Sequence, residues 1–146
     1  MRRVAIAGVL ALEPQVLVLD EPTAGLDPLG QAQMLDMFMR LQKEDKLTLV
    51  LISHQMDDVA RYADHVIVME GGTVVKTGTP EQVFSHTDWL RQRRLDVPRS
   101  MQFLEKLQER LGDQALAIDQ APLTVEALAD LLMAHLPAKE GTGHVG

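Results

Sequence analysis

A run of apolar residues that ends in two adjacent carboxylates constrains this chain more than any other feature. Residues 16–19 read Val-Leu-Val-Leu, and Asp20, Glu21 and Pro22 follow directly. An apolar run of this length, bounded by turn-forming residues, is typical of a strand buried on both faces, as in a parallel sheet. Carboxylates at the carboxyl end of such a strand lie where open α/β sheets bind ligands. Because such carboxylates are costly unless their charge is used, the pattern predicts a site with a cation and a reacting group.

A second apolar run ends in the same manner. Residues 46–53 read Lys-Leu-Thr-Leu-Val-Leu-Ile-Ser and are predicted to form the next buried strand, with His54 at its carboxyl end. Between the two strands, Pro28 suits the first turn of a helix that is expected to run to about Glu44, with Asp27 as its N-cap. A strand, a helix and a second strand in this order predict an α/β fold with a parallel sheet.

Composition excludes several classes of protein. The chain has 146 residues, with 46% hydrophobic and 24% charged, which is ordinary for a soluble globular protein. It has no cysteine, so neither disulfides nor thiolate metal sites are possible. The net charge of −7 argues against nucleic acid as the main partner. The longest apolar run, Val4 to Leu12, is far shorter than the roughly 20 residues of a membrane-spanning helix.

The motifs resemble those of a known family. The stretch LVLDEPTAGLDP is similar to the Walker B motif and D-loop of ATP-binding cassette (ABC) ATPases, and Ile52-Ser53-His54 resembles their switch histidine. The resemblance covers residues 1 to about 86 and implies part of the P-loop NTPase fold, a parallel sheet with flanking helices. The wording VIVMEGGTVVKTGTPEQVF resembles transport ATPases more than the DNA-repair and chromosome-structuring ATPases that share the other motifs.

The composition shifts after His86. Residues 99–111 carry an apolar face on a predicted helix that Gly112 ends, and Thr124 is expected to cap a last helix. The segments LDVPRSMQFLEKL and APLTVEALADLL resemble the C-terminal extension of the ATPases of energy-coupling factor (ECF) transporters, which helps to pair two ATPases. We therefore expect three parts: the C-terminal part of a nucleotide-binding domain (1–86), a small helical dimerisation extension (87–136) and a flexible tail (137–146).

The resemblance implies roles for four residues. Asp20 would hold Mg²⁺, and Glu21 would accept a proton from the water that attacks ATP. His54 would contact the γ-phosphate and orient the water or Glu21, and Asp27, counted with the nucleotide-binding residues, would face the partner subunit across the dimer. The alternatives are structural: the Asp20–Glu21 pair could cap the following loop, His54 could be an ordinary strand-end residue, and Asp27 could serve only as an N-cap.

Three parts of the family pattern are missing from these residues. There is no glycine-rich phosphate loop with its lysine, no glutamine loop, and the chain begins just where the signature loop should have ended. A phosphate loop holds phosphates with consecutive backbone amides and a lysine, and nothing in the sequence substitutes for it. The glycines of residues 141–146 lack a preceding strand and a following helix. We therefore expect this chain alone to bind ATP weakly or not at all.

The expected function is that of an ATPase subunit, in its C-terminal portion, of an ECF importer for vitamins or transition-metal ions, with ATP and Mg²⁺ as cofactors. It would pair with an identical or sister ATPase and with an integral membrane subunit, at the cytoplasmic face of the membrane. The main alternative is a truncated, non-catalytic interaction module that pairs with a full-length ABC ATPase. A non-transport ABC ATPase is a weaker alternative. Three arginines, Arg91, Arg93 and Arg94, fit a solvated face better than a contact with the membrane subunit or with acidic lipid.

Overall fold

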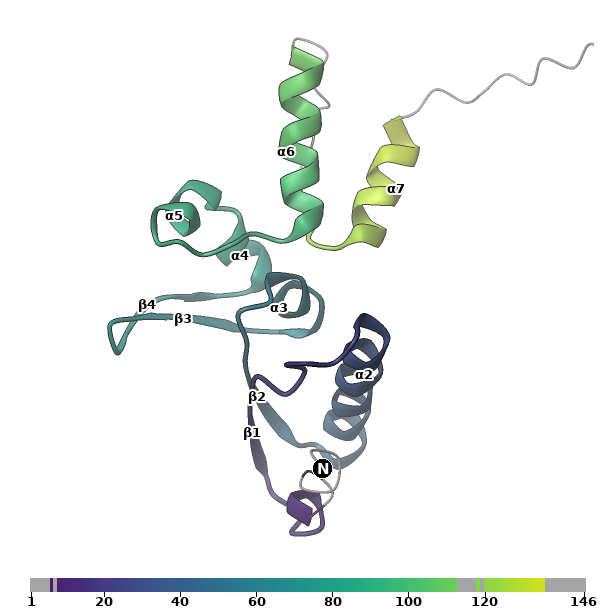
Figure 1. Ribbon diagram of the computed structural model, residues 1–146, viewed down its shortest axis with the longest axis vertical. Helices are drawn as coiled ribbons and strands as arrows, with labels where there is room; N and C mark the ends of the chain where they lie inside the picture. Colours follow the sequence, from purple (N-terminus) through teal and green to yellow (C-terminus); the bar gives the residue numbers. More distant parts are fainter. Residues whose placement is uncertain (1–5, 7, 113–117, 119, 136–146) are drawn as a thin grey trace, which may run out of the picture. The chain divides into compact units, whose positions relative to one another are not determined.

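The computed structural model describes residue 6 and residues 8–112, 118 and 120–135, and it divides into two compact units, Met1–Gln55 and Met56–Gly146 (Figure 1). Within the described residues, no helix is both long enough and apolar enough to cross a membrane. The N-terminal segment is described only in part: residues 6 and 8–10 are helical, and residues 1–5 and 7 lie outside the described residues.

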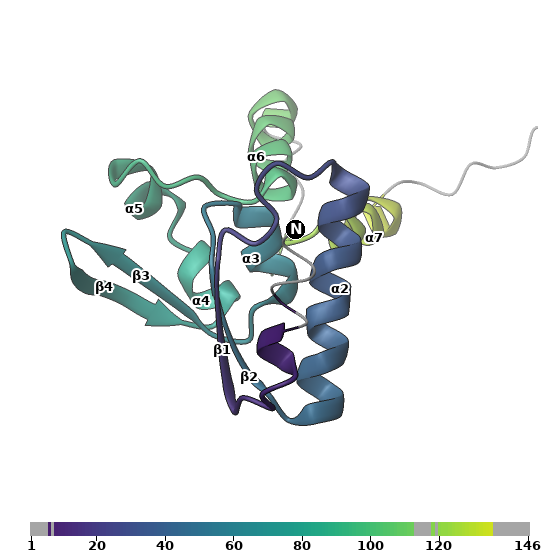
Figure 2. The same ribbon diagram turned by 60° about the horizontal axis from the view of Figure 1, so that its bottom comes forward.

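The first unit is a strand–helix–strand arrangement. Strand β1 (Val16–Asp20) pairs in parallel with β2 (Thr48–Ile52), in a register that runs from Val16 opposite Thr48 to Asp20 opposite Ile52. Helix α2 (Pro28–Asp45) connects them and lies along the sheet (Figure 2). The predicted α/β class with a parallel sheet and a flanking helix is therefore confirmed.

Burial of the two strands is one-sided. The core of the first unit is formed by side chains of β1, of α2 and of the residue just before β2: Leu17, Leu19, Met34, Leu35, Phe38 and Leu47. The alternate strand positions are 42–58% exposed: Val16, Val18, Val50 and Ile52. The expectation that both faces are buried is thus wrong for the described residues. Successive side chains of a strand point to opposite faces of the sheet. Among the described residues of this unit, the buried strand side chains lie on one face, and those on the other face are exposed.

The second unit contains a hairpin and five helices among its described residues. Helix α3 (Met56–Tyr62) precedes strands β3 (Val66–Glu70) and β4 (Thr73–Gly78), which pair antiparallel. Gly71 and Gly72 form the turn with φ values of 56° and 79°, a conformation that glycine adopts without steric cost. Helices α4 (Pro80–Phe84), α5 (Thr87–Gln92), α6 (Arg99–Leu111) and α7 (Val125–His135) follow.

Helix α4 was not foreseen, although its sequence carries a clear start signal. Thr79 Oγ1 accepts from the Gln82 N–H, and Gln82 Oε1 accepts from the Thr79 N–H, which is a complete capping box. Pro80 occupies the first helical turn, where its missing N–H costs nothing. The motif Thr-Pro-Glu-Gln alone could have identified this helix.

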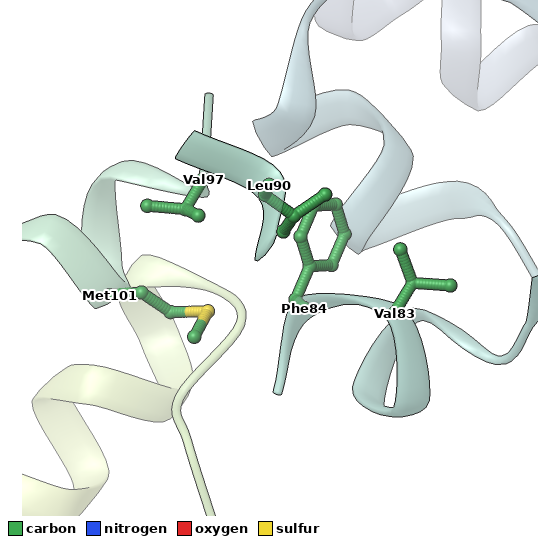
Figure 3. Packing of buried hydrophobic residues seen from close by; sticks show 5 residues of the cluster. All are labelled: Val83, Phe84, Leu90, Val97 and Met101. Atoms are coloured by element: carbon green, nitrogen blue, oxygen red, sulfur yellow. The ribbon is translucent and has the colours of Figure 1, made fainter. Parts of the chain in front are cut away.

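The core of the second unit brings three short segments together. The cluster is at most 5% exposed and its members pack against one another (Figure 3): Val83 and Phe84 of α4, Leu90 of α5, Val97 in the segment before α6, and Met101 of α6. Partly buried residues from α3, β3 and the segment before α7 pack around this cluster. The segments on either side of the predicted domain boundary at residue 86 therefore share one core. That boundary stays a functional prediction, and the predicted tail, 137–146, lies outside the described residues.

Two cationic side chains lie close to the ring of Trp89. The Arg93 guanidinium is 4.2 Å and the Lys76 ammonium 5.0 Å from the centre of the indole ring, within the range of a cation–π attraction. Arg93 also forms an ion pair with Glu70 at 3.4 Å, and Arg91 pairs with Glu105 of α6. Two of the three arginines singled out in the sequence thus have partners inside the same unit.

Removal of the buried ring at the centre of this core should destabilise the second unit strongly. We expect Phe84→Ala to lower the free energy of unfolding by about 3–5 kcal/mol, because it leaves a cavity among close-packed side chains. The matched control is Phe103→Ala, which truncates a 52% exposed ring and should change stability by about 0.5 kcal/mol. Urea denaturation followed by tryptophan emission gives both values; equal costs for the two variants would contradict the assigned core.

Candidate functional site

The carboxyl ends of the two parallel strands meet and position the candidate site. Asp20 is in register with Ile52, and the Glu21 N–H donates to the Ile52 carbonyl at 2.9 Å. This bond continues the sheet pairing one residue beyond the end of β1. Glu21 and His54, which are 33 residues apart in the sequence, are thereby brought to the same edge of the sheet.

Glu21 and His54 form the central contact. Oε1 of Glu21 lies 2.6 Å from His54 Nδ1 and also accepts from the His54 backbone N–H at 3.1 Å. The His54 side chain is 81% exposed and that of Glu21 30%. The other ring nitrogen, Nε2, is on the opposite edge of the exposed imidazole. One carboxylate oxygen therefore holds both the ring and the backbone of the histidine.

The second oxygen of Glu21 has no such partner. Oε2 is inaccessible to solvent and accepts no hydrogen bond within the described part of the chain. A buried carboxylate oxygen without a donor is unfavourable, so its presence at a strand end is consistent with a functional demand.

The backbone of Glu21 adopts an uncommon conformation. Its φ is 44°, in the left-handed region that non-glycine residues seldom occupy. The turn that follows is held by the Ala24 N–H on the Glu21 carbonyl (3.2 Å) and the Leu26 N–H on that of Thr23 (3.1 Å), with Thr23 buried. Backbone strain of this kind costs about 1–3 kcal/mol and concentrates at functional sites.

Asp20 is exposed at the end of β1. The described residues include no group of three or more potential metal ligands, so they form no protein cage for an ion. Mg²⁺ commonly takes only one or two protein carboxylates and completes its shell with water and phosphate oxygens. An accessible single carboxylate beside Glu21 fits that donor set, so Asp20 is the residue that would hold Mg²⁺ together with a nucleotide.

Asp27 caps helix α2, as the sequence predicts. Its Oδ1 accepts from the Gly30 N–H at 2.6 Å, and its backbone is extended. A Cβ on residue 30 would lie 2.8 Å from this oxygen, so the glycine allows the close approach. Asp27 does not contact Glu21 or His54 in any described interaction, and its assignment to a subunit interface stays a prediction.

Sequence reasoning missed the role of Ser53. Its Oγ accepts from the Gln55 N–H at 3.0 Å and so shapes the short connection that carries His54. A serine whose hydroxyl accepts from the amide two residues later is a known local turn, so Ser-His-Gln carried a recognisable signal. The contact between Glu21 and His54, by contrast, has no local sequence signal. It forms because the sheet brings the carboxyl ends of β1 and β2 together.

Known proteins resemble the chain closely. It is 56% identical over 133 residues to the energy-coupling factor transporter ATP-binding protein EcfA2 of Enterococcus faecalis, covering 91% of this chain and 45% of that protein. It is 54% identical over 142 residues to the EcfA2 of Halalkalibacterium halodurans, covering 97% and 49%. Among solved structures, CbiO1 from Clostridium perfringens, described as part of the ABC transporter complex CbiONQ, matches with a TM-score of 0.55 and 45% identity over 70% of this chain and 41% of that one. No protein-family model matches.

The fold and these likenesses define the class: the described elements are part of an ABC ATPase, a P-loop NTPase. More specifically, the chain belongs to the ATP-binding proteins of energy-coupling factor transporters and fits a C-terminal portion of them. It spans about half the length of the curated relatives that it matches.

Loss of the Asp27 carboxylate should weaken the start of helix α2. We expect Asp27→Ala to lower stability by about 1 kcal/mol, because the Gly30 N–H loses its acceptor. Asp27→Asn, which keeps an acceptor oxygen, is the matched control and should cost a few tenths. Far-ultraviolet circular dichroism in urea measures the stability, and hydrogen exchange at the Gly30 amide reports the cap itself. An unchanged exchange rate in the alanine variant would contradict the assignment.

Proposed function

We propose that this chain is the C-terminal part of the ATPase subunit of an ECF importer, which couples ATP hydrolysis to the uptake of a vitamin or a transition-metal ion. The observation that carries the proposal is the contact between Glu21 and His54 at the carboxyl ends of two parallel strands. The names of the relatives support the transporter class.

In the proposed mechanism, Mg²⁺ supplies charge stabilisation to the phosphates, and Asp20 would hold it. Glu21 acts as the general base that accepts the proton of the attacking water. His54 contributes by binding Oε1 through its ring and its backbone N–H, which fixes the direction of the carboxylate. The Nε2 edge of the exposed imidazole is available to a phosphate oxygen. General-base assistance of this kind contributes about 10²–10⁴ in rate.

We propose that residues outside this sequence bind the phosphates of the nucleotide. The chain has no glycine-rich phosphate loop, and the relatives that it matches are about twice as long. We propose that the complete subunit pairs with a second ATPase, identical or related, and with an integral membrane subunit at the cytoplasmic face of the membrane. The structural neighbour is described as part of a multi-subunit transporter complex, which supports this assignment.

A second candidate is an interaction module that pairs with a complete ABC ATPase without hydrolysing ATP itself. The observation in its favour is the second unit, which has its own buried core and holds helices α6 and α7. The two candidates differ in their dependence on Glu21, which a module does not need.

The general-base assignment predicts a large effect of one substitution. In the complete subunit assembled with its partners, Glu21→Gln should lower ATP turnover by about 10²–10⁴, since the amide cannot accept the proton. The matched control is Glu44→Gln, on the exposed surface of α2, which should leave turnover unchanged. Phosphate release measures both. Comparable turnover in Glu21→Gln and the unsubstituted protein, with association intact, would favour the interaction module.

The chain as given should bind nucleotide poorly. We expect a dissociation constant for ATP with Mg²⁺ in the millimolar range or weaker, because an exposed carboxylate and an imidazole without backbone amides offer few phosphate contacts. Isothermal titration calorimetry of the 146-residue chain measures it, with Glu21→Gln as the comparison. Binding below one micromolar would show that residues of this chain grip the phosphates after all.

A further inference from the structure

The imidazole of His54 is held by hydrogen bonds rather than by packing. Its side chain is 81% exposed, so neighbouring side chains do not lock the ring in place. The ring nitrogen Nδ1 lies 2.6 Å from Oε1 of Glu21, and the backbone N–H of His54 donates to the same oxygen at 3.1 Å. An exposed ring that is held at one atom keeps its direction only if the backbone that carries it is also fixed.

The sheet fixes the backbone on the amino side of His54. Ile52 is the last residue of β2, and its carbonyl accepts from the Glu21 N–H at 2.9 Å. The bond from the His54 N–H to Glu21 then restrains the next peptide group but one. These bonds do not act on the backbone that leads out of His54 on its carboxyl side.

Ser53 supplies a restraint on that side. Its Oγ accepts from the Gln55 N–H at 3.0 Å in a partly buried hydrogen bond, which competes less with water than an exposed one. The bond joins the two residues that flank His54, so the loop of atoms that it closes contains both backbone torsion angles of the histidine. All of these residues belong to the first unit, Met1–Gln55. The hydroxyl therefore sets the direction in which the imidazole leaves the backbone.

We propose that Ser53 is a positioning residue for His54: its hydroxyl fixes the backbone turn that holds the imidazole against Oε1 of Glu21. This inference rests on the proposed ATPase function, in which the direction of the Glu21 carboxylate determines its reach to the attacking water. Without the hydroxyl, the Gln55 N–H loses its acceptor, and the turn at His54 populates backbone angles that lengthen or break the Nδ1 contact. Ser53 itself touches neither nucleotide nor the reacting water.

The kinetic test uses the complete ATPase subunit assembled with its partners. Ser53→Ala should lower kcat about three- to tenfold, because a displaced histidine directs the general base less well. The KM for ATP should stay within about twofold, since in this proposal other residues bind the phosphates. Ser53→Thr keeps a hydroxyl at the same position and should retain most of the turnover.

A second readout follows the histidine itself. In the same subunit labelled with ¹⁵N-histidine, Ser53→Ala should shift or broaden the NMR signals of the His54 ring, and Ser53→Thr should restore them. The ring of His65, which bonds Thr77 in the second unit, is the internal reference and should keep its signals. A general loss of structure would change the signals of both rings.

The matched control is Ser85→Ala. The Ser85 hydroxyl donates to the Gln82 carbonyl at 3.0 Å, so it also makes a local bond to the backbone, and its loss should leave kcat and the His54 signals unchanged. The inference is overturned if Ser53→Ala keeps full turnover, if Ser53→Thr or Ser85→Ala loses as much turnover as Ser53→Ala, or if turnover falls while the His54 signals stay the same.

Glu21→Gln in the same assay separates this inference from the function on which it rests. If Glu21→Gln keeps full turnover, the proposed ATPase function fails. If Glu21→Gln abolishes turnover while Ser53→Ala keeps it, only the positioning role of Ser53 fails.

Discussion

The interaction on which the site depends is the double hydrogen bond from His54 to a single oxygen of Glu21. It requires parallel pairing of β1 and β2 in one register, because a shift by one residue would turn Glu21 to the other face. The Glu21 N–H on the Ile52 carbonyl extends that pairing, and the left-handed conformation of Glu21 then directs the side chain toward the histidine. Register, backbone strain and the side-chain contact are therefore parts of one arrangement.

Much of this arrangement could be predicted from the sequence. Carboxylates after one apolar run and a histidine after the next indicated that Asp20, Glu21 and His54 share an edge of the sheet, and Asp27 before Pro28 indicated the N-cap. Residue order cannot reveal that both bonds fall on Oε1 while Oε2 stays without a donor, since that depends on side-chain torsion angles in three dimensions. The ion pairs of Asp57 with Arg99 and of Arg61 with Glu126 could not be predicted for a related reason. Their partners are far away in the sequence, and exposed charges carry no periodic signal.

The exposure of β1 and β2 on one face shows why apolar composition alone predicted burial on both faces incorrectly. A continuous apolar run predicts cover on both faces, yet Val16, Val18, Val50 and Ile52 are exposed in the described residues. The sequence is nonetheless typical of strands in a parallel sheet, which are apolar at nearly every position, because the exposed positions are as apolar as the buried ones. The apolar composition of a strand indicates which of its faces could be buried. Which faces are buried in the structure depends on the other elements that pack against the sheet.

The contacts of the Trp89 indole with Lys76 and Arg93 have a practical consequence. It is the single tryptophan of the chain, and it belongs to the second unit, whereas Glu21 and His54 belong to the first. Emission from this indole is sensitive to the two neighbouring cations and therefore reports whether the hairpin and α5 stay together. Tryptophan fluorescence of this chain therefore reports on the second unit and does not report on Glu21 and His54.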